Sequence, residues 1–279
     1  MSSIISTYFV TVSTAQQGAT SQPTVVADNE YQVGAVMYMQ KAAEFRALSY
    51  QAFNVAKIYL DADFDKKNLK QLPKAELKMP RAVVVDVDET VLDNSQNTAY
   101  LIKNRMPYSP AIWTDWVKMK KAKPMPGAVD FLNYAKNKGV RIFYVTNRNT
   151  AEKEGTIGNL KDSGFPDVSE ETVMVKTTDS GKEIRRGMIS KDYRIVLLMG
   201  DNLNDLSELF EKSTNVKDQK ATVAERLTET DKAREMFGRK YIVLPNAIYG
   251  AWEDALYNYD RNLSEAEKAQ KRQSSIESY

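Results

Sequence analysis

The sequence contains no histidine and no cysteine among its 279 residues. Without histidine, a Ser-His-Asp triad, a phosphohistidine intermediate and a histidine-ligated metal are all excluded. Without cysteine, disulfides, thiolate catalysis and zinc–sulfur sites are excluded as well. Any catalysis must therefore use carboxylates, lysine, arginine, hydroxyl groups or a hard metal ion.

An excess of charge of either sign is also lacking. The chain has 39 Lys and Arg against 37 Asp and Glu, a net charge of +2, so we expect no nucleic-acid partner. Glycine and proline are few, at 12 and 9, and 42% of the residues are hydrophobic, which suits a folded chain with one sizeable core. No segment approaches the roughly 18 apolar residues of a membrane span, so we expect no transmembrane helix.

The first 29 residues differ in composition from the rest. The apolar run IISTYFVTV at residues 4–12 precedes a stretch of small polar residues. This order resembles the hydrophobic region and cleavage zone of a secretory signal, although the usual positive charge before it is missing. We expect residues 1–29 to be a signal-like or disordered leader, and the protein to be exported to the periplasm or cell envelope.

Five short apolar runs indicate β-strands. They do not alternate with polar residues, as is required of strands that are buried on both faces. The runs lie at residues 82–85, 141–145, 172–175, 195–199 and 241–244. Helix-forming sequence separates them, and strands that alternate with helices predict a parallel sheet covered on both sides. We therefore expect an α/β fold with a Rossmann-like parallel sheet and an added small helical lobe.

The helical lobe is expected at residues 30–79, with a helix over residues 30–60. Apolar residues recur there at spacings of three and four, the period of an amphipathic helix. This apolar stripe consists of Phe45, Leu48, Ala52, Val55 and Tyr59.

The core is expected at residues 80–260. Ser109 and Pro110 are an N-cap and a first-turn proline, which predict a helix that begins at this point. At residues 261–279, Ser264 and Glu267 form a capping box for a charged last helix, which we expect to be a solvated tail.

Polar clusters follow three of the predicted strands. These are DVDET at residues 86–90, TNR at 146–148 and GDNLND at 200–205. In an open parallel sheet, ligands bind beyond the carboxyl ends of the strands, so the clusters are expected to converge. Asp86 and Asp88 lie two residues apart and can face one site. Asp201 and Asp205 lie about one helical turn apart if a helix begins near Leu203.

Three or four carboxylates in one crevice repel one another. At about 4 Å and an effective dielectric constant near 20, each like-charge pair costs on the order of 4 kcal/mol. The whole stability margin of a domain is roughly 5–15 kcal/mol, so a cation has to offset this repulsion. With oxygen ligands alone, the fit is a hard ion such as Mg²⁺, which commonly shares its coordination with a substrate phosphate.

Four segments occur in a fixed order along the chain: DVDETVLDN, VTNR, DSGKE and GDNLND. Together they resemble the four motifs of the haloacid dehalogenase superfamily of phosphatases. The closer resemblance is to the class C acid phosphatases, the bacterial outer-membrane lipoprotein type with 5′-nucleotidase activity. A single DxD pair is weak evidence, whereas four ordered motifs at strand ends are specific. Segments at 44–57, 123–131 and 244–253 resemble that family too, so the likeness covers roughly residues 30–260.

The resemblance implies the haloacid dehalogenase fold with a helical cap insert, and a role for each matching residue. Asp86 would be the nucleophile that forms an aspartyl-phosphate, and Asp88 would be the general acid and base. Thr146, with backbone amides around Asn147, would hold the phosphoryl oxygens, and Lys182 would neutralise the transferring group. For Lys182, a surface lysine is the competing interpretation, because other lysines lie nearby.

The same resemblance implies the metal ligands. Asp201 would bind Mg²⁺ together with Asp86 and the backbone carbonyl of Asp88, with Asp205 in support. Asp205 is also compatible with a simple first-turn acid of a helix. Asp93 and Asn94 are assigned a structural role, as an N-cap for the next helix.

Two aromatic residues lie in tracts that resemble the substrate-binding segments of the family. Trp113 and Tyr249 would stack on the base of a nucleotide, because every base has a π-face. The alternative is that both are ordinary core residues.

These observations predict a Mg²⁺-dependent acid phosphatase that hydrolyses phosphomonoesters, with nucleoside 5′-monophosphates as the expected substrate class. Asp88 must carry a proton to act as an acid, and crowding by like charges gives a reason for it, so activity on the acid side is expected. The alternatives are a sugar phosphatase of the same superfamily, or a non-enzymatic storage or binding protein, which the presence of Asp86 disfavours. The expected partner is a small phosphomonoester or nucleotide, and a homodimer is a possible assembly. The family is usually anchored through a lipidated cysteine that this sequence lacks, which leaves anchoring open.

Overall fold

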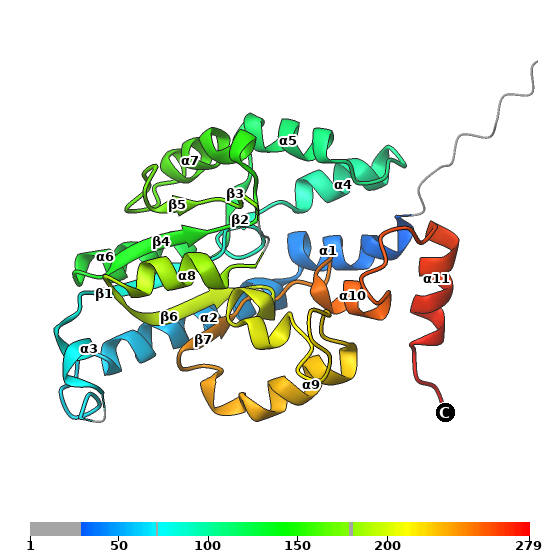
Figure 1. Cartoon of the computed structure of the whole chain (residues 1–279). Coiled ribbons are helices and arrows are strands. Elements are labelled where there is room, and N and C mark those ends of the chain that lie inside the picture. The colour runs from blue at the N-terminus through cyan, green and yellow to red at the C-terminus, as the bar shows by residue number, and fades with distance from the viewer. Residues whose placement is uncertain (1–28, 71, 179–180) are drawn as a thin grey trace, which may run out of the picture.

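A parallel five-stranded sheet forms the centre of the computed structural model, which describes residues 29–70, 72–178 and 181–279 (Figure 1). The strand order is β5-β4-β1-β6-β7. The strands are β1 (Arg81–Val85), β4 (Arg141–Val145), β5 (Val173–Met174), β6 (Arg194–Gly200) and β7 (Tyr241–Val243). Each lies within one residue of a predicted apolar run at either end, and the predicted α/β fold class is confirmed.

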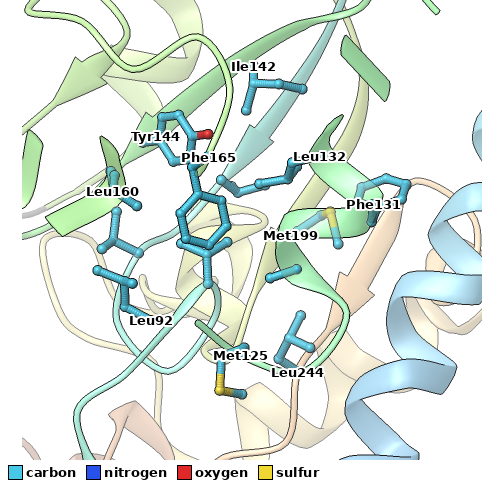
Figure 2. Packing of buried hydrophobic residues seen from close by; sticks show 14 of the residues in the cluster. Leu92, Met125, Phe131, Leu132, Ile142, Tyr144, Leu160, Phe165, Met199 and Leu244 are labelled. Atoms are coloured by element: carbon cyan, nitrogen blue, oxygen red, sulfur yellow. The ribbon is translucent and has the colours of Figure 1, made fainter. Parts of the chain in front are cut away.

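The central strand β1 is buried on both faces of the sheet. Val83 and Val85 belong to one apolar cluster, and Ala82 and Val84 belong to another on the opposite face. Figure 2 shows side chains of the first and larger cluster. Because successive residues of a strand face opposite sides, a strand covered on both sides must be apolar at every position. This explains why β1 has no alternation of polar and apolar residues.

Helices cover the two faces of the sheet. On the side of the larger cluster, α2 packs against α6, β6 and β7, and α6 packs against β4. On the other side, α8 packs against β6. These helices are α2 (Ala43–Ala62), α6 (Ala128–Asn137) and α8 (Glu183–Ser190).

The predicted helix at residues 30–60 differs from the structure in two ways. Ala42 has extended backbone, with ψ of 130°, and separates α1 (Val33–Lys41) from α2. The predicted apolar stripe is wrong for Leu48, which is 41% exposed, whereas Ser49 is buried. Ser49 lies in the core because its hydroxyl donates a hydrogen bond to the carbonyl of Pro126, at 2.8 Å. The buried residues of α2 are Phe45, Ser49, Phe53, Ala56 and Leu60.

Between β1 and α6 the chain forms an insert of two helices and a short antiparallel ribbon. Its helix α5 begins as predicted, since the hydroxyl of Ser109 accepts a hydrogen bond from the N–H of Ile112 at 3.2 Å. α5 packs against α7, and α4 packs against α1. In Figure 1, α5 and α7 lie side by side at the top, with β5 below α7, and α4 lies to their right above α1. The insert consists of β2 (Leu92–Asp93), α4 (Ser95–Lys103), α5 (Pro110–Met119) and β3 (Lys123–Pro124). The helix α7 (Lys153–Asp162) follows β4 and is not part of it.

The last helix, α11 (Glu265–Ser274), begins at the predicted capping box of Ser264 and Glu267. None of its residues is buried, and Arg272 connects it to the rest of the chain. The guanidinium of Arg272 lies 3.7 Å from the centre of the Tyr31 ring and donates a hydrogen bond to the hydroxyl of Tyr257 at 2.8 Å. These contacts dock α11 against the segment before α1 and against Tyr257, the residue after α10 (Ala251–Leu256).

The remaining helices complete the fold at its periphery. They are α3 (Lys74–Lys78), α9 (Val223–Lys232) and α10 (Ala251–Leu256). In the part of the chain that the structure describes, no helix has the length and apolar character needed to cross a membrane. The leader predicted at residues 1–29 lies, except for its last residue, outside the described residues.

Candidate active site

The carboxylate cluster lies at the carboxyl ends of β1 and β6, which are neighbours in the sheet. Asp86 follows β1 directly, and its N–H donates to the carbonyl of Met199 at 2.9 Å. Asp201 follows β6 directly, and Asp205 ends a short 3₁₀ helix that begins at Leu203. One carboxylate oxygen from each of the three aspartates lies within 4.8 Å of the others. The structure thus brings together three of the four predicted metal ligands.

A glycine makes the close approach of Asp205 to the end of β6 feasible. A Cβ atom placed on Gly200 would overlap the side chain of Asp205. The turn after Gly200 is held by a capping box, in which the N–H of Asn202 donates to the Asp205 carboxylate at 3.2 Å. The segment GDNLND therefore needs glycine at position 200 so that Asp205 can fold back toward the sheet.

Lys182 is the lysine that the structure places in the cluster. Its side chain is 4% exposed, and its ammonium pairs with the carboxylate of Asp86 and, at 2.7 Å, with that of Asp205. Neither Lys176 nor Lys191 forms an ion pair within the described residues. Burial lowers the pKa of Lys182, but Asp205 and Asp86 outweigh it and raise the pKa above its ordinary value. The group therefore stays charged at neutral pH.

One ammonium does not neutralise three carboxylates. Burial raises the pKa of Asp86 to about 7, against the opposing effect of Lys182 and with a further increase from Asp205. Burial also raises the pKa of Asp201 well above its ordinary value, and Asp205 and Asp86 raise it further. No ion pair among the described residues includes Asp201. A cluster of oxygen donors with this excess of negative charge fits a hard divalent cation.

Two neutral residues hold Asp201 in place. The hydroxyl of Thr90 lies 3.2 Å from a carboxylate oxygen of Asp201 and accepts a hydrogen bond from its N–H at 3.0 Å. The side-chain amide of Asn246 donates to the other carboxylate oxygen at 2.8 Å. Sequence analysis did not identify Asn246 as a site residue. It follows β7 closely, so the search for polar residues after strands would have found it at the fourth strand end.

Asp88 lies outside the carboxylate cluster and has an arginine as its nearest charged neighbour. Arg148 donates to one carboxylate oxygen of Asp88 from Nη2 at 2.7 Å and from Nε at 3.0 Å. The side-chain amide of Asn94 donates to the same oxygen at 2.9 Å. Asp88 therefore faces the guanidinium of Arg148 in addition to the nearby like charges of Asp86 and Glu89.

Asp93 and Asn94 were both predicted to cap the next helix, and only the side chain of Asp93 accepts a hydrogen bond at its start. The carboxylate of Asp93 accepts a hydrogen bond from the N–H of Ser95 at 2.8 Å, at the first residue of α4. The side chain of Asn94 makes no cap hydrogen bond and points instead to Asp88. Sequence analysis assigned Asn94 a structural role and gave no role to Arg148, since neither contact is visible in local sequence.

Thr146 and Asn147 follow β4 as predicted. Thr146 is fully buried, and its hydroxyl lies 3.4 Å from Asp88. Asn147 is exposed. Both residues are held by Arg185, which donates to the carbonyl of Thr146 at 2.5 Å and to the side-chain oxygen of Asn147 at 2.7 Å. This loop therefore lies next to Asp88, the second aspartate of the DxD pair.

The two predicted stacking residues reach the same region from separate elements. Trp113 of α5 is half-buried, and its ring centre lies 5.5 Å from the guanidinium carbon of Arg148. Tyr249 is 37% exposed and donates its hydroxyl to the carboxylate of Glu89. Glu89 is wholly buried, and burial, followed by Asp88 and Asp201, raises its pKa well above its ordinary value.

The chain is similar to known acid phosphatases in both sequence and structure. A family model described as the HAD superfamily, subfamily IIIB (Acid phosphatase), matches residues 4–252. The chain is similar to the class C acid phosphatase from Bacillus anthracis, at 36% identity and a TM-score of 0.79, over 90% of this chain and 98% of that one. A structure of that enzyme with tungstate bound has the same identity and coverage and a TM-score of 0.80.

A plant protein is related more distantly. The chain is 27% identical over 135 residues to "Acid phosphatase 1" of Solanum lycopersicum, which is 44% of this chain and 51% of that protein. The match thus spans about half of the plant protein's length. These relatives are named acid phosphatases, so the predicted enzyme class, a phosphoric monoester hydrolase, is confirmed at the level of the family. With a family model that matches nearly its whole length, the chain belongs to the HAD superfamily, subfamily IIIB, the acid phosphatases.

Proposed function

We propose that this protein hydrolyses small phosphomonoesters, with nucleoside 5′-monophosphates as the preferred class, through an aspartyl-phosphate on Asp86. The observation that carries the proposal is the cluster of Asp86, Asp201 and Asp205, in which the buried ammonium of Lys182 pairs with Asp86 and Asp205. Support comes from the Bacillus anthracis relative, whose structure holds tungstate, a tetrahedral oxyanion of the shape of phosphate.

The three aspartates would hold the divalent cation, for which Mg²⁺ is the proposed ion. Their oxygen donors and unbalanced charge match the preferences of that ion. When bound, it supplies positive charge that stabilises the phosphoryl oxygens.

In the first step, a carboxylate oxygen of Asp86 attacks phosphorus, an O–P bond forms, and the bond between phosphorus and the alcohol oxygen breaks. Asp88 donates a proton to the departing alcohol. In the second step, water attacks the phosphorus of the aspartyl-phosphate, Asp88 takes its proton, and the bond between phosphorus and the Asp86 oxygen breaks, which frees inorganic phosphate and the Asp86 carboxylate. Lys182 and the loop of Thr146 and Asn147 supply the donors for the phosphoryl oxygens.

Two features favour nucleotides over sugar phosphates. Trp113 provides an aromatic face close to Arg148, and Tyr249 provides one close to Glu89. Aromatic faces can stack on any nucleotide base. A sugar phosphatase of the same superfamily remains the second candidate, and the ratio of turnover of a nucleotide to that of a sugar phosphate separates the two. Export to the cell envelope and a homodimer stay predictions, the first supported by the apolar run at residues 4–12.

The decisive experiment measures hydrolysis of p-nitrophenyl phosphate after removal of metal with EDTA and titration with Mg²⁺. We expect activity to depend on Mg²⁺ and to fall roughly 10⁴-fold in Asp86→Asn, since a lost nucleophile removes the covalent route. Asp130→Asn, at an exposed position in the first turn of α6, is the matched control and should behave as wild type. Equal activity in wild type and Asp86→Asn would refute the proposed mechanism.

A further inference from the structure

Asn94 is a buried side chain whose amide orientation is fixed by its neighbours. It is 2% exposed, and its side-chain oxygen accepts a hydrogen bond from the indole N–H of Trp116 at 2.8 Å. Because an indole nitrogen can only donate, the oxygen of Asn94 must face Trp116. The amide NH₂ group then points to Asp88, to which it donates at 2.9 Å. The backbone N–H of Asn94 donates to Glu89 at 2.8 Å, which fixes the residue at a third point.

Arg148 holds the same carboxylate from the other side. Its side chain is 1% exposed, and it donates to Asp88 from both Nη2 and Nε. Its third nitrogen, Nη1, donates to the hydroxyl of Thr156 at 3.1 Å. The planar guanidinium is therefore locked in one orientation before any substrate arrives.

These contacts treat the two oxygens of Asp88 differently. Oδ1 accepts short hydrogen bonds from Asn94 and from two nitrogens of Arg148, at 2.7–3.0 Å. Oδ2 has longer contacts, at 3.3 Å from Arg148 and 3.4 Å from Thr146, and no shorter one within the described part of the chain. One oxygen is thus anchored to the protein, and the other is left to exchange a proton with a reacting group.

We infer that Asn94, oriented by Trp116, and Arg148 are positioning residues that hold Asp88 with Oδ2 directed at the leaving group. The inference rests on the proposed function, in which Asp88 protonates the alcohol. Trp116 lies on α5, so the packing of this helix fixes the orientation of Asn94 and, through it, of the Asp88 carboxyl group. A purely structural role, in which these groups only satisfy one another's hydrogen bonds, makes a different prediction about substrates.

The test uses a series of phosphomonoesters whose leaving groups run from p-nitrophenol through phenol to a simple alkyl alcohol. The quantity measured is kcat/KM, which includes the steps up to release of the alcohol. A good leaving group departs without a proton, whereas a poor one needs the general acid. A misplaced Asp88 should therefore lower kcat/KM mainly for alkyl phosphates. The reference is Asp88→Asn, which removes the proton donor altogether.

Two conservative variants test the positions. Trp116→Phe keeps an aromatic ring but removes the N–H that orients Asn94, and Arg148→Lys keeps the charge but removes the planar fork. In each we expect kcat/KM to fall roughly 10- to 100-fold for the alkyl phosphate and less than about 3-fold for p-nitrophenyl phosphate. Tyr100→Phe, at a ring 51% exposed on α4, is the control for a mild aromatic substitution in the insert and should leave the series unchanged.

Each outcome decides between the possibilities. In one outcome, kcat/KM of Asp88→Asn depends strongly on the leaving group, while kcat/KM of Trp116→Phe and Arg148→Lys changes with the leaving group as in wild type. The inference is then overturned and the proposed function stands. A rise in KM of equal size for every substrate in Arg148→Lys would assign Arg148 to phosphate binding and also overturn it. If Asp88→Asn itself matches wild type across the series, the proposed role of Asp88 fails, and the inference fails with it. Comparison of Tm values with wild type identifies any variant that has lost its fold, and the other variant then carries the test.

Discussion

The ammonium of Lys182 lies 2.7 Å from the carboxylate of Asp205, although the two residues come from different segments that follow different strands. The same ammonium also pairs with Asp86, so a single cation links two sides of the carboxylate cluster. The cluster is thereby both the proposed reaction centre and a point of electrostatic weakness. The following predictions separate these two properties.

Replacing Lys182 by methionine is expected to destabilise the metal-free protein by about 3 kcal/mol, because removal of one partner leaves buried carboxylates uncompensated. The loss should be smaller in excess Mg²⁺, which supplies positive charge in its place. Urea unfolding in EDTA and in Mg²⁺ measures both values. Lys191→Met, at an exposed lysine on the same segment, should change neither. An equal loss in both buffers would contradict the proposed site for the cation.

The stability of the metal-free protein should fall as the pH rises toward neutrality. Burial raises the pKa of Asp86 from its ordinary value of 3.8 to about 7, so between these values the folded protein binds this proton more tightly than the unfolded chain. The contribution to stability is fully present below pH 3.8 and is lost as the pH rises through about 7, with a slope of up to roughly 1.4 kcal/mol per pH unit.

Denaturant unfolding in EDTA at several pH values between 4 and about 8 measures this slope. Asp86→Asn removes one titrating group and should reduce the slope, while Asp201 and Glu89, whose pKa values are raised as well, still contribute. Asp130→Asn should leave the dependence as in wild type. Added Mg²⁺ should restore stability most strongly near neutral pH, where the carboxylates are ionised. A stability that rises from acid to neutral pH in EDTA would show that another group dominates.

Asn246 should contribute to metal affinity without being a ligand. Its amide donates to Asp201 at 2.8 Å and so fixes one carboxylate oxygen. Loss of such a supporting hydrogen bond commonly weakens metal binding by roughly 10- to 100-fold, and we expect this range for Asn246→Ala. Calorimetric titration with Mg²⁺ measures the affinity, with Asn262→Ala at an exposed asparagine as control. An unchanged affinity would mean that Thr90 alone suffices to hold Asp201.

Gly200→Ala should damage the site and the fold together. The added methyl group would overlap Asp205, so either the end of β6 or the following turn must move, at a cost of roughly 1–3 kcal/mol. Gly187→Ala in α8 has no atom within 4 Å of the new methyl group and is expected to stabilise by up to about 1 kcal/mol. Unfolding and Mg²⁺ titration of the two variants give the comparison. A Gly200→Ala protein with wild-type stability and affinity would show that the turn adapts freely.

The strands were predictable from sequence because a strand that is buried on both faces is a continuous apolar run. Such a run can be recognised without knowing which strands lie beside it. β4 and β6 were recognisable as apolar runs with polar clusters directly after them. The same rule predicted Asp86 and Asp201 at one edge, since parallel strands place their carboxyl ends together. Apolar periodicity was less reliable in α2, where Ser49 is buried through one hydrogen bond and Leu48 is not.

The surroundings of Asp88 could not be predicted in the same way. Arg148 lies 60 residues from Asp88 along the chain, and Trp116 lies 22 residues from Asn94. Which hydrogen bonds such side chains make depends on how the insert packs on the loop after β4, and no local pattern records that packing. The sequence supplied the chemistry of the site, and tertiary contacts supplied its orientation.

The stacking of Arg272 on Tyr31 brings the segment before α1 next to α11. All five strands of the main sheet lie between these two places in the chain, and the exposed turn at residues 66–68 lies before the first of them. A short peptide that joins the segment after α11 to the one before α1, with the chain opened at that turn, would keep every strand in its order. The architecture therefore admits circular permutation, which would move both chain ends to the side of the molecule near α3.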